Sequence, residues 1–232
     1  MSSGLSPARV YQRLRNPADR LRPGSRGEPR VRLLASATRA DFFREFARAE
    51  VHNDARHNRA YSRGLGLDLF ARVRSGDMDG IDRKGHSLIR STVISTRPTF
   101  LRPLLRLGLR WSYGDLSPSG LSRLRVPDLD IFRHTAPSRC LGDFVLALDR
   151  GEGGVWRPLA RNYGRMRSRF DPRRMVGVPI VVGATSRGPF TVVEGLTRLS
   201  ILVSRLGRGE PVPRRIRALI GLGPKAENWK FF

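Results

Sequence analysis

Residues 190–206, FTVVEGLTRLSILVSRL, contain the change of hydrophobic pattern that decides the fold. The run Phe190–Val193 is β-branched and aromatic, which is typical of a strand. Gly195 follows, and beyond it apolar residues recur at helical spacing. A strand that turns through glycine into a helix N-terminus is a common way to hold an anion, and also a common way to turn a corner. The residues that share the apolar helix face are Leu199, Leu202, Val203 and Leu206.

The segments around this junction extend the pattern to β–β–α–β. VGVPIVVGA at 176–184 and IRALIGL at 216–222 read as further strands, and TSRGP between the first two strands reads as a turn. This order predicts an α+β fold, with a small mixed sheet and packed helices. We expect the region before it to be mostly helical.

Three regions are expected along the chain. Residues 1–35 are predicted to be a disordered basic arm, 36–150 a mixed and mainly helical region, and 151–232 the α+β domain. The boundary is placed at GEGG, residues 151–154, because three glycines in four residues separate two patterned regions.

Within 36–150, the clearest element is an amphipathic helix at 38–50. Thr38 is its predicted cap, and Phe42, Phe43 and Phe46 form its apolar face. The β-branched density of 86–96 predicts a strand. Helices are expected in the middle of 98–116 and near 138–149.

The charge of the chain favours polyanionic partners. Its 232 residues carry a formal net charge of +24, and only three of the 44 basic residues are lysines. Eight arginines lie in 1–32 and seven in 157–174, which suits contact with nucleic-acid phosphates, although the arm could equally be a solvated tail. The candidate nucleic-acid-binding residues are Arg9, Arg13, Arg165, Arg173 and Arg174.

Other features of the sequence argue against a disulfide-bonded, secreted, membrane-spanning or metal-binding protein. The single cysteine, Cys140, allows no disulfide within the chain and is expected to be a buried structural thiol. No signal peptide and no membrane span are predicted, so we expect a cytoplasmic protein with no membrane partner. No metal site is predicted, because His52 and His57 are five apart and the Asp77 segment has Leu88 where a calcium loop needs glutamate.

The order Pro-Ile-Val-Val, hairpin, Val-Val-Glu-Gly-x-Thr-Arg-Leu, helix, Pro-Val-Pro, strand resembles the ParB/sulfiredoxin-like superfamily. The resemblance covers about Trp156 to Leu222. It implies that Gly195 is the motif glycine and that Arg198 contacts a nucleotide phosphate. Leu196 stands where sulfiredoxins have their reactive cysteine and ParB proteins a carboxylate, so neither of those activities is implied.

The residues of the junction allow two classes of function. In the first, Gly195, Thr197 and Arg198 bind a phosphate of a nucleoside triphosphate, and Glu194 is a catalytic base or holds Mg²⁺, with weak phosphotransfer or hydrolysis. In the second, Glu194 pairs with Arg198 and the chain is a catalytically degenerate nucleic-acid-binding or interaction module. Whether it is an enzyme, and its oligomeric state, stay open at this point.

Overall fold

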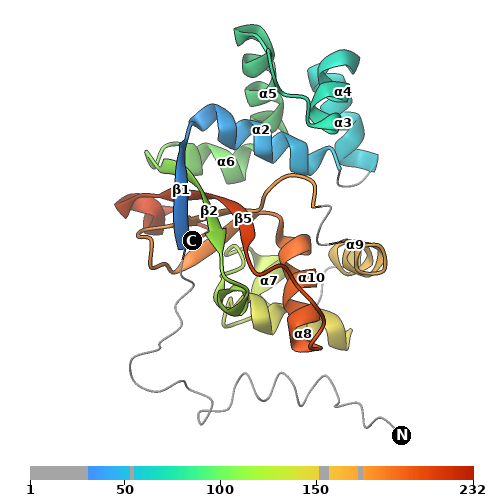
Figure 1. The fold of residues 1–232 in the computed structure, drawn as a ribbon, viewed down its shortest axis with the longest axis vertical. Helices are drawn as coiled ribbons and strands as arrows, with labels where there is room; N and C mark the ends of the chain where they lie inside the picture. The colour runs from blue at the N-terminus through green and yellow to red at the C-terminus, as the bar shows by residue number, and fades with distance from the viewer. Residues whose placement is uncertain (1–30, 53–54, 152–156, 172–174) are drawn as a thin grey trace, which may run out of the picture.

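A five-stranded mixed β-sheet forms the middle layer of the protein, with helices on both faces (Figure 1). The computed structural model describes residues 31–52, 55–151, 157–171 and 175–232. The strand order is β1-β2-β5-β3-β4. The strands are β1 (Val31–Ala37), β2 (Arg110–Leu116), β3 (Ile180–Gly183), β4 (Phe190–Glu194) and β5 (Ile216–Leu222).

The pairing of the strands joins distant parts of the chain. β1 pairs antiparallel with β2, and β2 pairs antiparallel with β5. β3 pairs in parallel with β5 and antiparallel with β4. The predicted β–β–α–β unit is therefore present, and two strands from the first half of the chain extend its sheet.

The helices divide between the two faces of the sheet. In Figure 1, α2 to α6 lie above the sheet, and α7, α8 and α10 lie below it. The helices are α2 (Arg39–Glu50), α3 (Ala55–Leu65), α4 (Leu67–Ser75), α5 (Arg83–Thr96), α6 (Pro98–Leu105), α7 (Asp130–Arg133), α8 (Leu141–Arg150), α9 (Arg157–Arg167) and α10 (Leu196–Gly207), with the short 3-10 helices η2 (Pro118–Arg123) and η4 (Pro224–Asn228).

Side chains along the central strands point alternately to the two faces of the sheet, and each face has its own hydrophobic core. In β3, Val181 packs against α8 and α10, whereas Ile180 and Val182 belong to the core with α2 and α5. In β5, Ile220 belongs to the core with α8 and α10, and Leu219 belongs to the core with α2 and α5. This alternation is the two-residue period of a sheet that is buried on both sides.

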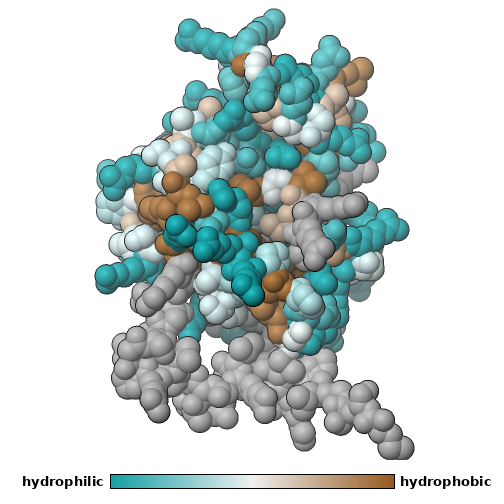
Figure 2. All heavy atoms as spheres, in the orientation of Figure 1, coloured by the Kyte–Doolittle hydropathy of each residue, from teal (hydrophilic) through white to brown (hydrophobic). Residues whose placement is uncertain are grey.

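β1 is an edge strand whose two faces are largely open. Leu33 and Leu34 have exposed fractions of 44% and 39%. Figure 2 shows hydrophobic residues gathering in this part of an otherwise mostly hydrophilic surface. The pairing with β2 shifts register between Leu33 and Ala35, an irregularity that commonly blunts an edge strand.

Several sequence predictions are confirmed. The fold is α+β with a mixed sheet, and β4, α10 and β5 lie where the pattern placed them. Thr38 caps α2 in a capping box: its hydroxyl accepts the Asp41 N–H at 3.2 Å, and the Asp41 carboxylate accepts the Thr38 N–H at 2.7 Å.

The strand predicted at 86–96 is wrong, because this segment is most of helix α5. Asp82 caps the helix by accepting the Gly85 N–H at 2.7 Å. Ile89, Thr92 and Val93 are its buried residues, and they have the i, i+3, i+4 spacing of one helix face. Burial of that face outweighs the strand preference of the β-branched residues.

The predicted boundaries also differ from the structure. The disordered arm was expected to reach residue 35, but β1 begins at Val31; residues 1–30 lie outside the described part of the chain. Gly151, where the boundary between two regions was predicted, is the left-handed cap of α8. The segment after it shares its sheet with β2 and its core with α8, so the described residues of the two predicted regions form common cores.

Candidate functional site

The junction of β4 and α10 has the geometry that requires glycine. Gly195 has φ +89° and ψ 15°, in the left-handed region, and it is the N-cap of α10. A Cβ atom there would lie 3.1 Å from two atoms of Pro179 and 3.2 Å from Nη2 of Arg198. The Gly195 carbonyl accepts the Leu199 N–H at 2.9 Å. The glycine thus serves both the turn and the close approach of neighbouring groups.

Arg198 directs its guanidinium into the protein. Its Nη1 donates to the carbonyl oxygens of Val176 and Gly177, the second at 2.8 Å. Its Nη2 lies 3.5 Å from Oε1 of Glu194, and the residue is only 8% exposed. These bonds fasten the segment before β3 to the first turn of α10. The arginine predicted to hold a phosphate is therefore engaged by protein oxygens in this structure.

Glu194 belongs to a partly buried group of charges. Burial raises the pKa of its carboxyl, and the negative charge of Glu50 raises that pKa further, whereas the positive charges of Arg198 and Arg97 oppose the shift. Glu50 is fully buried and accepts from Nε and Nη2 of Arg97 at 2.9 and 2.7 Å. Two carboxylates from α2 and β4 therefore share one environment with two arginines.

Two further polar contacts extend this group toward β2 and α3. Glu45 accepts the Val178 N–H at 3.2 Å and the Tyr113 hydroxyl at 3.4 Å. Tyr61 is buried beside Glu50, and its hydroxyl lies 3.4 Å from that of Thr96; burial raises the pKa of this tyrosine. The network connects α2, the α5–α6 junction and the start of α10.

Sequence reasoning missed Glu45, Glu50 and Arg97. One signal was available: Glu50 follows Phe46 by four residues, so it lies on the apolar face of α2. A charged residue in that position is buried, and a buried charge requires a partner. Nothing local indicated that the partner would be Arg97.

A Mg²⁺ ion beside Glu194 is not favoured by the residues around it. Within the described ranges, no group of three or more His, Cys, Asp or Glu side chains is placed to hold a metal ion. The carboxylate of Glu194 faces Arg198 instead. The described residues thus form no cluster of three or more metal-ligating side chains at this junction.

The three predicted phosphate-binding residues differ in their exposure to solvent. Thr197 is partly exposed in the first turn of α10, whereas Gly195 and Arg198 are buried. Among the nucleic-acid candidates, Arg165 lies exposed on α9. Arg9, Arg13, Arg173 and Arg174 lie outside the described residues.

Helix α9 presents a basic face. Arg157, Arg161 and Arg165 follow one another at intervals of four residues and are exposed, as is Arg169 just beyond the helix. On the inner side, Tyr163 is buried and donates to Asp149 at 2.6 Å. We call the row Arg157, Arg161, Arg165 and Arg169 the α9 basic face.

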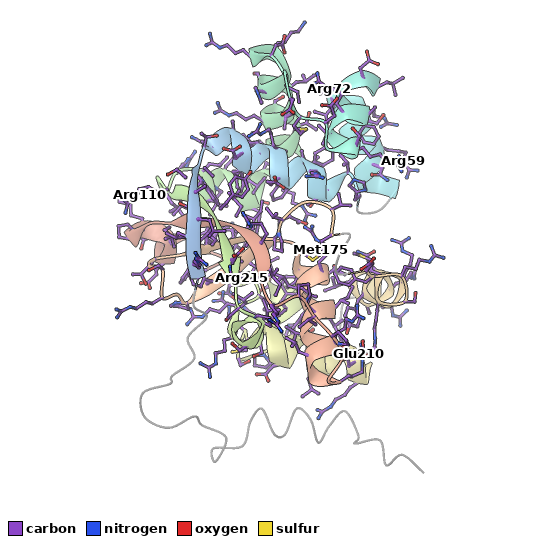
Figure 3. The ribbon with its side chains drawn as sticks, in the orientation of Figure 1. Arg59, Arg72, Arg110, Met175, Glu210 and Arg215 are labelled. Atoms are coloured by element: carbon purple, nitrogen blue, oxygen red, sulfur yellow. The ribbon has the colours of Figure 1, made fainter. Side chains whose placement is uncertain are left out.

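The α9 basic face is not neutralised by described carboxylates. Arg165 donates to the Asn162 side chain at 2.9 Å, but none of the four arginines forms an ion pair with a carboxylate in the described part of the chain. Arg167, on a different side of the helix, does pair with Asp149 at 2.8 Å. Figure 3 shows that arginine side chains also extend outward elsewhere, among them Arg59 and Arg110 on opposite sides of the view.

Comparisons of this chain with protein-family models, with curated proteins and with solved structures find no match. None of the helices in the described ranges has the length and apolar character needed to span a membrane.

Proposed function

We propose that this protein binds nucleic acid through phosphate contacts, with the α9 basic face as a principal contact surface. The supporting observation is the row of exposed arginines on α9 that lack carboxylate partners among the described residues. Successive arginines in the row are separated by four residues, or about 6 Å along the helix axis. A polyanion that follows the helix can therefore contact several guanidinium groups at once.

The net charge supports the same function. An excess of +24 repels itself unless counterions or a polyanion compensate it. Binding to phosphates releases condensed counterions, so the affinity of such a protein falls steeply as salt increases. This mechanism carries no base readout and predicts binding with little sequence preference.

The experiment compares a triple variant, Arg157→Gln, Arg161→Gln and Arg165→Gln, with the parent on a duplex DNA over a range of salt concentrations. Removal of three phosphate contacts should reduce the slope of log affinity against log salt by about 2.7. The matched control replaces Arg63 on α3, Arg106 just after α6 and Arg187 in the turn between β3 and β4 by glutamine; all three are exposed.

The control variant loses the same charge without losing the row. If both triple variants change the slope equally, net charge alone drives binding and the α9 surface has no special part. Unchanged affinity in the α9 variant, or no binding by the parent at low salt, contradicts the proposal.

A second candidate function is the binding of a nucleotide phosphate at the N-terminus of α10. It is supported by the left-handed Gly195 and by Thr197, a partly exposed residue whose hydroxyl has no hydrogen-bond partner among the described residues. The first-turn amides and the helix dipole favour an anion at that position. Glu194 beside them is the group that would orient a reacting hydroxyl.

Thr197→Val tests this second candidate better than any change of Arg198. Truncation of Arg198 leaves Glu194 without its ion-pair partner and should cost about 3–5 kcal/mol of stability, which confuses binding with folding. Thr197→Val should keep the Tm of the parent but lose the increase in Tm produced by nucleoside triphosphates. An equal increase in both proteins, or none in the parent, contradicts nucleotide binding at this turn.

A further inference from the structure

A second cluster of basic side chains lies where α2 and α4 end. We define the α2/α4 basic cluster as Arg48, His52 and Arg74. The Nε2 atom of His52 lies 2.9 Å from the carbonyl oxygen of Arg74, which can only accept, so Nε2 carries the proton and Nδ1 faces away from this bond. The bond holds the imidazole against the last turn of α4.

A glycine makes room for the third member of the cluster. Gly76, the left-handed cap of α4, has φ +84°. A Cβ atom at this position would lie 2.6 Å from Nη2 and 2.9 Å from Cζ of Arg48. The guanidinium of Arg48 therefore lies directly against the backbone at the end of α4, next to the segment that holds Arg74.

The positive charges in this cluster are not matched by nearby carboxylates. Neither Arg48 nor Arg74 forms an ion pair with a carboxylate of the described residues, and Nε of Arg48 is enclosed without an acceptor there. Glu45, one turn before Arg48, accepts from Val178 and Tyr113 instead.

The electrostatic surroundings of His52 agree with this geometry. Partial burial lowers the pKa of its imidazole, the hydrogen bond to the Arg74 carbonyl opposes that effect, and the charges of Arg74, Arg48 and Arg198 lower it again. Three arginines from α2, α4 and α10 thus act on one histidine. The carbonyl ends of α2 and α4 carry partial negative charge and offset only part of this excess.

We propose that Arg48 and Arg74 bind a phosphate group beside His52. A phosphate offers several acceptor oxygens at once, which suits guanidinium donors from two helices. The N–H of His52 is already donated to the Arg74 carbonyl, so this imidazole reports on the bound anion rather than holding it. His52 and Arg74 are exposed, so a ligand can reach the site from solvent. The site includes no residue of the α9 basic face and does not include Thr197, so it does not depend on the proposed function.

The first test uses the intact parent protein and inorganic phosphate. Its imidazole NMR signals are followed while phosphate replaces chloride at constant ionic strength and pH. We expect the His52 signals to shift and to saturate, while those of His86 and His134 act as internal controls and do not. If the His52 signals stay unshifted like those of His86 and His134, the arginines only stabilise the C-terminal ends of the helices and the proposal is wrong.

The second test uses variants. Arg74→Gln changes an exposed side chain and should weaken phosphate binding about tenfold or more, measured by the same NMR signals and by the increase in Tm with phosphate. Arg48→Gln should do the same, and the exposed Arg106→Gln is the matched control. Phosphate binding that is equal in Arg74→Gln and Arg106→Gln overturns the proposal, even if Arg48→Gln fails to fold.

A further arm distinguishes the source of the phosphate. Duplex DNA is titrated into the parent and Arg74→Gln. Weaker DNA binding by the variant identifies a backbone phosphate as the ligand. Unchanged DNA binding together with lost binding of inorganic phosphate identifies a small phosphate compound.

Discussion

Glu194 and Arg198 show how one pair of residues supports two interpretations. Their sequence positions suit a phosphate site, since Arg198 lies in the first turn of a helix after a glycine. In the structure, Arg198 instead donates to two backbone carbonyls and to Glu194. A guanidinium has five donors in a fixed plane, so these acceptors determine its direction.

The raised pKa of Glu194 makes the stability of the protein depend on pH. A carboxyl with a raised pKa in the folded state contributes stability that is fully present below its ordinary pKa of about 4.3 and is lost as pH rises through the folded value. We therefore expect Glu194→Gln to gain stability relative to the parent as pH rises above about 4.3. Denaturant unfolding at a series of pH values measures this difference.

The control for this experiment is Glu227→Gln, which changes an exposed carboxyl. Its stability should run parallel to that of the parent over the same pH range. Parallel curves for Glu194→Gln as well would show that Glu194 does not titrate abnormally in the folded protein.

At the scale of single elements, α9 has one side that packs against the core and another side that carries exposed arginines. Leu159, Ala160 and Met166 pack against the α8 and α10 core together with the buried Tyr163. The arginines occupy the other side, and Gly164 is exposed in the middle of the helix. Glycine is unfavourable in a helix interior because it loses more backbone freedom on folding than any other residue.

Gly164→Ala should stabilise the protein by about 0.5–1 kcal/mol, or about 1–4 °C in Tm. A Cβ atom at Gly164 meets no atom within 4 Å among the described residues, so the added methyl group causes no clash. Thermal unfolding measures the change. Gly195→Ala is the contrasting variant and should lower Tm, because that backbone is left-handed and Pro179 is close. Equal effects of the two substitutions would contradict this reasoning.

At the scale of the whole molecule, the sheet unites the first and second halves of the chain. β5 lies between β2 and β3, so its hydrogen bonds on one side come entirely from residues 110–116. α10 also packs against α8 across the same division. A fragment that begins at Gly151 would expose both surfaces to water.

We therefore expect a chain of residues 151–232 alone to be unfolded. Its NMR spectrum should lack dispersion and its unfolding should lack cooperativity. Co-expression with residues 1–150 should restore both properties, because the missing strand and helix are then supplied. A dispersed spectrum from the isolated fragment would show that it is an independent domain after all.

The sequence by itself determined the elements whose signals are local. Thr38 and Asp41 specify the start of α2 by contacts three residues apart, and the change of period at Gly195 marks the passage from β4 to α10. The α+β class followed from that order of elements. These features depend on neighbours in the chain, so a pattern of residues is enough to predict them.

Only the tertiary structure decided which strands pair and where the polar side chains point. β1, β2 and β5 are separated by many residues, and each is paired by hydrogen bonds that no local pattern encodes. The α5 segment became a helix because its apolar face could be buried against α2 and α3. Arg198 likewise turned inward because the carbonyls of 176 and 177 lie within its reach, and that proximity arises from the packing of the segment before β3 onto the start of α10.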